Sequence, residues 1–174
     1  MYVLLATALL VGSAAWTSLG CNSSSNCKGG ELCECRDGYD CYPGCEGDGC
    51  NTYCHQMKKC GSVCDDHCQS RCDNMDDCST ACGSDCLATC SHTANCGVIC
   101  GAGCNYRCDN TTNCGVHAGP NSVIECNNVS VCEVACDGPC QLTCNNVGTP
   151  CKLSCPPSMP LNDCRGGRFA CGPC

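Results

Sequence analysis

Cysteines four residues apart set the pattern of inward and outward positions along this chain. Many of the short segments that they bound read Cys-x-φ-x-Cys, where φ is often apolar, as in CGVIC (96–100), CNYRC (104–108) and CQLTC (140–144). Alternate residues of a β-strand point to the same side, so both cysteines and φ face inward together. The pattern predicts short, half-buried strands.

Segments of turn-forming residues separate these strands. The spacer between paired strands is short and rich in Gly, Asp and Pro, as in GSD (83–85), GAG (101–103) and DGP (137–139). A longer polar spacer, such as DNTTN (109–113), leads to the next set. Each unit is therefore predicted as a strand, a tight turn, a second strand and a wider turn. A helical reading is disfavoured because Gly and Pro each cost about 1 to 3 kcal/mol in a helix interior.

The unit repeats every 18 residues. One coil keeps Cys114 and Cys126 in register but has Ala118 and Ser122 where the two inner cysteines belong. The regular sets are Cys60, Cys64, Cys68, Cys72; Cys78, Cys82, Cys86, Cys90; Cys96, Cys100, Cys104, Cys108; and Cys132, Cys136, Cys140, Cys144, while Cys41, Cys45, Cys50, Cys54 carry one extra residue. Stacking such units predicts an all-β, disulfide-stapled fold, a thin two-sided β-solenoid of 18-residue coils. A string of small disulfide-rich modules is the alternative.

Four segments follow from this organisation. Residues 1–20 carry a short apolar run and are interpreted as a signal peptide, and residues 21–26 as a polar tether. Residues 27–155 hold the repeat, and residues 156–174 form a C-terminal cysteine-rich cap.

Composition makes the cysteines the main source of stability. The chain has 31 Cys among 174 residues but only 19 Leu, Val, Ile, Met and Phe side chains after residue 20. So few apolar groups cannot offset the conformational entropy of the chain, so cross-links must hold the fold. Export to an oxidising compartment implies that the thiols are paired.

The altered coil suggests how they pair. Loss of both inner cysteines together predicts that they bond directly to each other, which gives Cys64–Cys68, Cys82–Cys86, Cys100–Cys104 and Cys136–Cys140. Parity favours bonds across the wider turn over bonds within a coil, which remain the alternative. The across-turn bonds are Cys27–Cys33, Cys35–Cys41, Cys54–Cys60, Cys72–Cys78, Cys90–Cys96, Cys108–Cys114, Cys126–Cys132 and Cys144–Cys151. Cys45 and Cys50 are further candidates for disulfide bonding. The C-terminal cysteines that remain form an even set: Cys155, Cys164, Cys171 and Cys174.

Cys21 is left over directly after the signal-like segment. That position suggests lipidation, with an ordinary disulfide as the alternative. The stretch CEVACDGPCQLTCNNVGTPCKLSC (132–155) resembles cysteine-rich repeat lipoproteins of myxobacteria and related bacteria. The resemblance implies an envelope-anchored surface protein, in which the membrane is reached only through a lipid at Cys21.

Charge and candidate chemistry narrow the function classes. A net charge of -8 leaves no patch that would neutralise phosphates, so nucleic acid is not an expected partner. The sequence has no recognisable catalytic set, and we expect no cofactor and no metal site. The CGPC motif (171–174) ends the chain, so a terminal staple is preferred to a redox dithiol. Solvated turn residues are preferred to a Ca²⁺ site for the aspartates at positions 65, 66, 73, 76, 77 and 85.

These observations predict a non-catalytic extracellular or envelope scaffold of the adhesion type. Its expected partner is a protein or a glycan bound on a solenoid surface. A thiol-rich metal-binding protein and a secreted effector or toxin are the alternatives.

Overall fold

The structure, a computed structural model, describes residues 26–174, which form 14 β-strands and no helix. The strands are β1 (Asn26–Lys28), β2 (Leu32–Cys41), β3 (Gly44–Glu46), β4 (Asn51–Cys64), β5 (Gln69–Cys82), β6 (Leu87–Cys100), β7 (Asn105–Asp109), β8 (Asn113–Ala118), β9 (Ser122–Val129), β10 (Val131–Cys136), β11 (Cys140–Val147), β12 (Lys152–Ser154), β13 (Leu161–Asp163) and β14 (Arg168–Cys171). No helix that could span a membrane is found among these residues. The expected signal peptide, Cys21 and residues 21–25 of the expected tether lie outside the described part of the chain.

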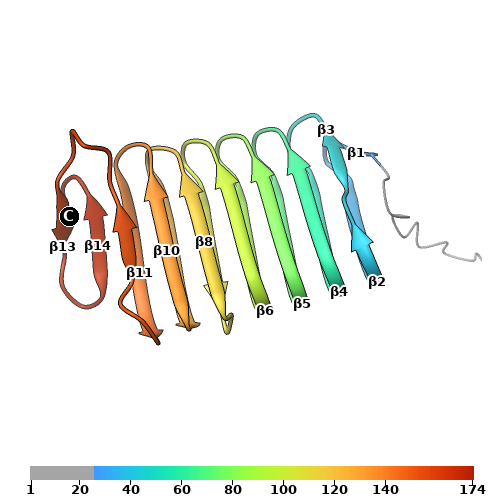
Figure 1. Cartoon of the computed structure of the whole chain (residues 1–174). Helices are drawn as coiled ribbons and strands as arrows, with labels where there is room; N and C mark the ends of the chain where they lie inside the picture. Colours follow the sequence, from blue (N-terminus) through green and yellow to red (C-terminus); the bar gives the residue numbers. More distant parts are fainter. Residues whose placement is uncertain (1–25) are drawn as a thin grey trace, which may run out of the picture.

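The strands stack as the coils of a parallel β-solenoid (Figure 1). Equivalent cysteines lie opposite one another in the strand ladders between successive coils: Cys54 lies opposite Cys72, Cys72 opposite Cys90, and Cys90 opposite Cys108. The predicted fold of stacked 18-residue coils is therefore confirmed. The alternative of separate modules is wrong, because separate modules would not share one continuous hydrogen-bonded ladder.

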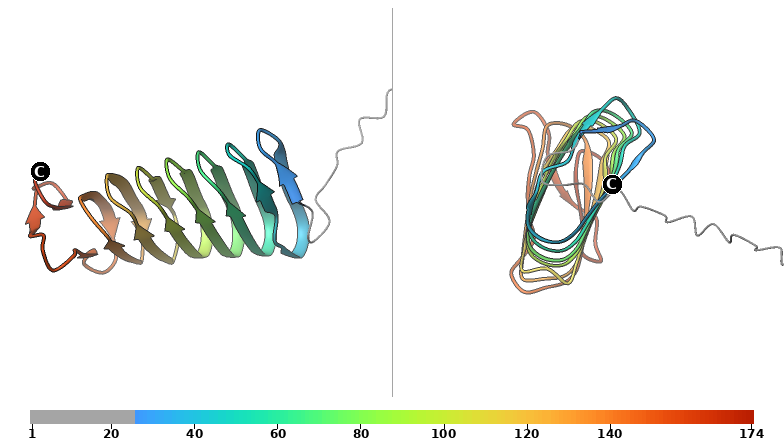
Figure 2. Two further views of the ribbon diagram at one scale, coloured as in Figure 1. Left: turned by 90° about the horizontal axis from the view of Figure 1, so that it is seen from above. Right: turned by 90° about the vertical axis from the view of Figure 1, so that its right-hand side faces the viewer.

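Seen along its axis, the solenoid is a flattened ring with two opposed faces (Figure 2). The first face contains β1, β3, the C-terminal halves of β4, β5 and β6, and then β8, β10 and β12. The second face contains β2, the N-terminal halves of β4, β5 and β6, and then β7, β9 and β11. Tight turns join the faces along one edge, and the five-residue arcs join them along the other.

The arcs differ from the wide turns expected from sequence in four coils, those of β2, β4, β5 and β6. Each of these strands runs without a break through its arc, so that Asp73 lies opposite Ser91 and Met75 opposite Thr93. The bend comes from one residue per coil with a positive φ, such as Asn74 at 54°. Asn adopts this left-handed conformation more readily than most residues do. The inward side of the arcs is filled by one column of buried residues: Met57, Met75, Thr93, Thr111 and Val129.

Polar side chains on the arcs bond to their equivalents in the next coil. Asn95 donates to Asp77 at 2.7 Å, and Asn113 donates to Asn95 at the same distance. A parallel ladder joins Asn127 to Asp109 at 2.9 Å and Asn145 to Asn127 at 2.8 Å. The recurrence of Asn and Asp in the five-residue segments therefore stabilises the stack as well as the bend.

The residues between the two faces change character along the axis. In the early coils the hydroxyls of Ser62, Ser70 and Thr80 form a buried triad, with oxygen–oxygen distances of 3.1, 3.2 and 2.9 Å. Later coils place apolar groups at the equivalent positions, namely Val98, Tyr106, Val116, Ile124, Val134 and Leu142. Within the triad each hydroxyl finds its partners in the other two, as buried polar groups usually do, whereas the buried hydroxyls of Thr52 and Thr111 have no hydrogen-bond partner in the structure.

An antiparallel hairpin closes the C-terminal end. Strand β14 pairs with β11 and with β13, and Phe169 lies opposite Leu142. The hairpin is fixed by the Cys155–Cys171 and Cys164–Cys174 disulfides. It covers the last coil of the second face, an arrangement that limits edge-to-edge association of strands.

Candidate functional site

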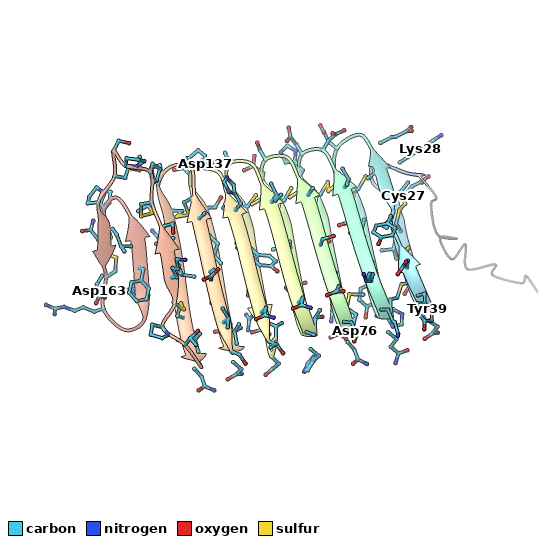
Figure 3. All side chains as sticks on the ribbon, in the orientation of Figure 1. Cys27, Lys28, Tyr39, Asp76, Asp137 and Asp163 are labelled. Carbon is cyan, nitrogen blue, oxygen red and sulfur yellow. A yellow bond between two sulfur atoms is a disulfide. The ribbon has the colours of Figure 1, made fainter. Side chains whose placement is uncertain are left out.

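A ladder of short-range disulfides fills the interior, and its sulfur atoms run the length of the solenoid (Figure 3). The structure contains all eight of the across-turn pairs given above, from Cys27–Cys33 to Cys144–Cys151. It also pairs Cys45 with Cys50, Cys64 with Cys68, and Cys136 with Cys140. Cα atoms of these pairs are 6.2–6.6 Å apart, so the two faces are separated by little more than one disulfide.

Two of the expected disulfides are absent from the structure. Cys82, Cys86, Cys100 and Cys104 are free thiols, so the Cys82–Cys86 and Cys100–Cys104 pairing is wrong for this structure. Cys82 lies directly opposite Cys100 in the β5–β6 ladder, so each sulfur has neighbours in its own coil and in the next. Cys136, which is bonded to Cys140, lies opposite Ala118, whereas Cys64, which is bonded to Cys68, lies opposite Cys82. We call the group of Cys82, Cys86, Cys100 and Cys104 the four-thiol cluster.

The four-thiol cluster is compact and nearly enclosed. The Sγ atoms of Cys82, Cys86 and Cys104 lie within 4.8 Å of one another. Cys100 hydrogen-bonds to Cys104 and Cys82, and these bonds lower the pKa of its thiol. The pKa of Cys82 is raised, chiefly by its hydrogen bond to Cys100. Three of the four side chains are buried, and Cys82 is partly exposed.

Other close groupings of metal-ligating side chains within residues 26–174 also consist of cysteines, and those cysteines are in disulfides. The aspartates do not gather. Asp65, Asp66 and Asp85 lie at the tight turns, whereas β5 carries Asp73 and Asp76 through an arc on the opposite edge. In Figure 3, Asp76 marks the arc edge and Asp137 the edge of the tight turns. This placement agrees with solvated turn residues.

Histidines and the CGPC motif take structural positions. His67 lies 3.8 Å from Asp85, His92 3.3 Å from Asp73, and His117 2.9 Å from Asp137, each in an exposed pair between coils. Within CGPC, Cys171 bonds to Cys155 and Cys174 to Cys164, so the two cysteines of the motif do not pair with each other.

A shallow apolar groove runs along the outside of the first face. Its floor is a column of small residues that point outward one position after a cysteine: Gly61, Ser79, Gly97 and Gly115. A parallel column two positions further on supplies Val63, Ala81, Ile99 and His117 as one wall. Val63 and Ile99 are 63% and 64% exposed, and with Ala81 between them in the ladder they form a contiguous apolar strip. The groove has a volume of about 540 Å³, within the range of ligand-binding clefts.

Both ends of the groove are blocked. At the N-terminal end the ring of Tyr42 covers Gly61, because a Cβ atom on that glycine would lie 2.7 Å from Cδ1 of Tyr42. At the other end Glu133 takes the position next to Gly115 in the ladder and pairs with Lys152 at 3.5 Å. The apolar stretch therefore spans a few coils and has charged groups at one end.

The groove cannot be predicted from the inward positions of the repeat, because outward residues form it. The signal was present as Gly or Ser directly after the first cysteine of four successive sets. Small outward residues on a strand leave a depression, and the period of 18 aligns these depressions from coil to coil.

Comparisons with known proteins identified no relative of this chain. No family model matches the chain, and neither a curated protein nor a solved structure matches it. The candidate sites therefore rest on the residues and their geometry.

Proposed function

We propose that the protein is a non-catalytic scaffold that acts outside the cell or in the cell envelope and binds a partner through the groove on its first face. The observation that carries this proposal is the exposed apolar column of Val63 and Ile99 beside a floor of small residues. Exposed apolar surface of this kind is typical of interaction sites. The partner is a protein or a glycan that presents an apolar face.

The other surfaces support a structural role. The extensive disulfides indicate an oxidising, extracellular environment. Inward positions are taken by cysteines and by small or apolar side chains, which leaves the interior filled with structural groups. The resemblance of residues 132–155 to cysteine-rich repeat lipoproteins supports an envelope location, with Cys21 as the proposed point of lipid attachment.

The proposal is tested by measuring how well cells that carry the gene attach to surfaces and to other cells. We expect gene deletion to reduce attachment to surfaces or to other cells, and the wild-type gene to restore it. A gene with Gly97→Arg should fail to restore it, because the long side chain fills the groove. The substitution is compatible with folding, since a Cβ atom there meets only the carbonyl oxygen of Cys78, at 4.0 Å.

Asn105→Arg is the matched control. Asn105 is exposed on the second face, in the ladder opposite Leu87, so this substitution adds the same charge away from the groove. Attachment that survives both gene deletion and Gly97→Arg would overturn the proposal. If attachment survives while activity against another cell is lost, the protein is an effector.

A further inference from the structure

The four-thiol cluster is the one group of free cysteines among residues 26–174, and it is built from two neighbouring coils. Cys82 and Cys100 come from the first face, at the ends of β5 and β6. Cys86 and Cys104 directly precede β6 and β7 on the second face. Each face thus contributes two sulfur atoms to the thin interior. Two pairs of ligands on opposite sides of a metal ion are compatible with tetrahedral coordination.

We propose that Cys82, Cys86, Cys100 and Cys104 bind one Zn²⁺ ion as a tetrathiolate site between the two faces. Four cysteines are a common ligand set for structural zinc. A Zn–S distance of about 2.3 Å in a tetrahedron places the sulfurs about 3.8 Å apart. The sulfurs of Cys82, Cys86 and Cys104 already lie within 4.8 Å of one another, and Cys100, which hydrogen-bonds to Cys104 and Cys82, has to move toward them to complete the site.

The surroundings of the cluster suit a buried ion. On the next coil, Ala118 lies opposite Cys100, and the hydroxyl of Ser122 accepts a hydrogen bond from the N–H of Cys104 at 3.2 Å. The altered coil therefore adds no further sulfur and closes the cluster from one side. Cys82, which is partly exposed, provides the route by which an ion enters.

The proton balance is simple. Four thiols lose four protons, and the bound ion gives a site of net charge −2. In the metal-free protein the thiols of Cys86 and Cys104 donate to the carbonyl oxygens of Gly83 and Gly101 at 3.5 and 3.4 Å, and these bonds are given up when the ion replaces the protons. Zinc is not redox-active, and coordination keeps the thiolates from being oxidised while the rest of the chain forms disulfides.

The experiment is zinc analysis of the full chain, secreted into zinc-containing medium and purified under nitrogen without reductant. We expect about one zinc per chain, and we expect Cys82, Cys86, Cys100 and Cys104, identified by peptide mapping, to react with a thiol reagent only after denaturation with a chelator. Cys82→Ser/Cys104→Ser should lose the zinc. Cys136→Ser/Cys140→Ser is the matched control, because it removes a disulfide at the same position of another coil, and it should keep the zinc.

A second measurement covers the case in which the double variant fails to fold. Wild-type protein loaded with Co²⁺ in place of Zn²⁺ should show the intense sulfur-to-cobalt charge-transfer absorption of a tetrahedral thiolate site. Two disulfides among the four cysteines, found by peptide mass spectrometry, would overturn the proposal, as would zinc-free protein or absent charge-transfer bands. The result is independent of the groove, because zinc content is measured without any partner.

Discussion

Ser122 accepts a hydrogen bond from the backbone N–H of Cys104 at 3.2 Å and donates one to the carbonyl oxygen of Gly119 at 2.8 Å. It stands where other coils have a cysteine, so a hydroxyl replaces a disulfide as the link at this level. Ser122→Ala leaves a buried N–H without a partner, which costs about 1 to 3 kcal/mol. We expect the midpoint of guanidinium unfolding under non-reducing conditions to fall accordingly. Ser154→Ala, at an exposed position of β12, should leave the midpoint unchanged. Equal midpoints for the two variants would show that the hydroxyl is not a structural link.

The buried triad of Ser62, Ser70 and Thr80 predicts a non-additive mutant series. Thr80→Val preserves the shape but removes one hydroxyl that both serines contact, and it should cost about 1 kcal/mol. Replacing all three with Ala, Ala and Val should recover much of this loss, because no unpaired polar group remains. Unfolding free energies from denaturant titration give the coupling. If the losses simply add, the triad is not a coupled network.

Asn127 is the middle member of an arc ladder, since it donates to Asp109 and accepts from Asn145. Asn127→Ala breaks both bonds and should cost about 1 to 2 kcal/mol. Asn127→Asp should cost more at neutral pH, because it stacks a second carboxylate beside Asp109, and the extra cost should disappear in acid. Unfolding midpoints measured at neutral and acidic pH separate the two effects. A pH-independent difference between these variants would contradict the charge argument.

The lowered pKa of Asp73 predicts that the protein loses stability in acid. Its pKa lies below the ordinary value of 3.8, first because Ser91 donates a hydrogen bond to the carboxylate at 2.7 Å, and also because His92 is close, although burial opposes the shift. A carboxyl with a lowered pKa contributes stability above 3.8 and loses it as the pH falls through the folded-state pKa. Asp73→Asn should therefore flatten the stability profile below this pH. Asp76→Asn, on the exposed side of the same arc, is the control and should follow the wild type.

The repeat and the strand direction could be predicted because the cysteine spacing fixes them directly. In CGVIC (96–100), for example, alternation alone identifies Val98 as buried between two cysteines, and it is. The arcs were less predictable, because Asn and Asp in NNVSV (127–131) indicate a turn. The inward Val129 of this segment belongs to a column that appears only when equivalent positions of successive coils are compared.

The four-thiol cluster was not predictable, because sequence spacing treats each coil alone. Cys82 and Cys86 have the same spacing as Cys64 and Cys68, yet only the second pair is bonded in the structure. Cys64 also lies opposite a cysteine of the next coil, Cys82, so stacking alone does not separate the two cases; the cluster is visible only once the register has placed Cys82 opposite Cys100, 18 residues away. The groove depends on the same register, which aligns Gly97 with Gly115 across β6 and β8.

Disulfides and hydrogen-bonded ladders stabilise different parts of this fold. Between Cys27 and Cys151 each disulfide joins cysteines only 4–7 residues apart, while the backbone ladders join one coil to the next. Duplication or deletion of a regular 18-residue coil, such as residues 55–72, therefore leaves every disulfide-forming cysteine with a partner at the same spacing. The gene can lengthen or shorten the rod in whole-coil steps, so its reach can evolve without a new cross-linking pattern.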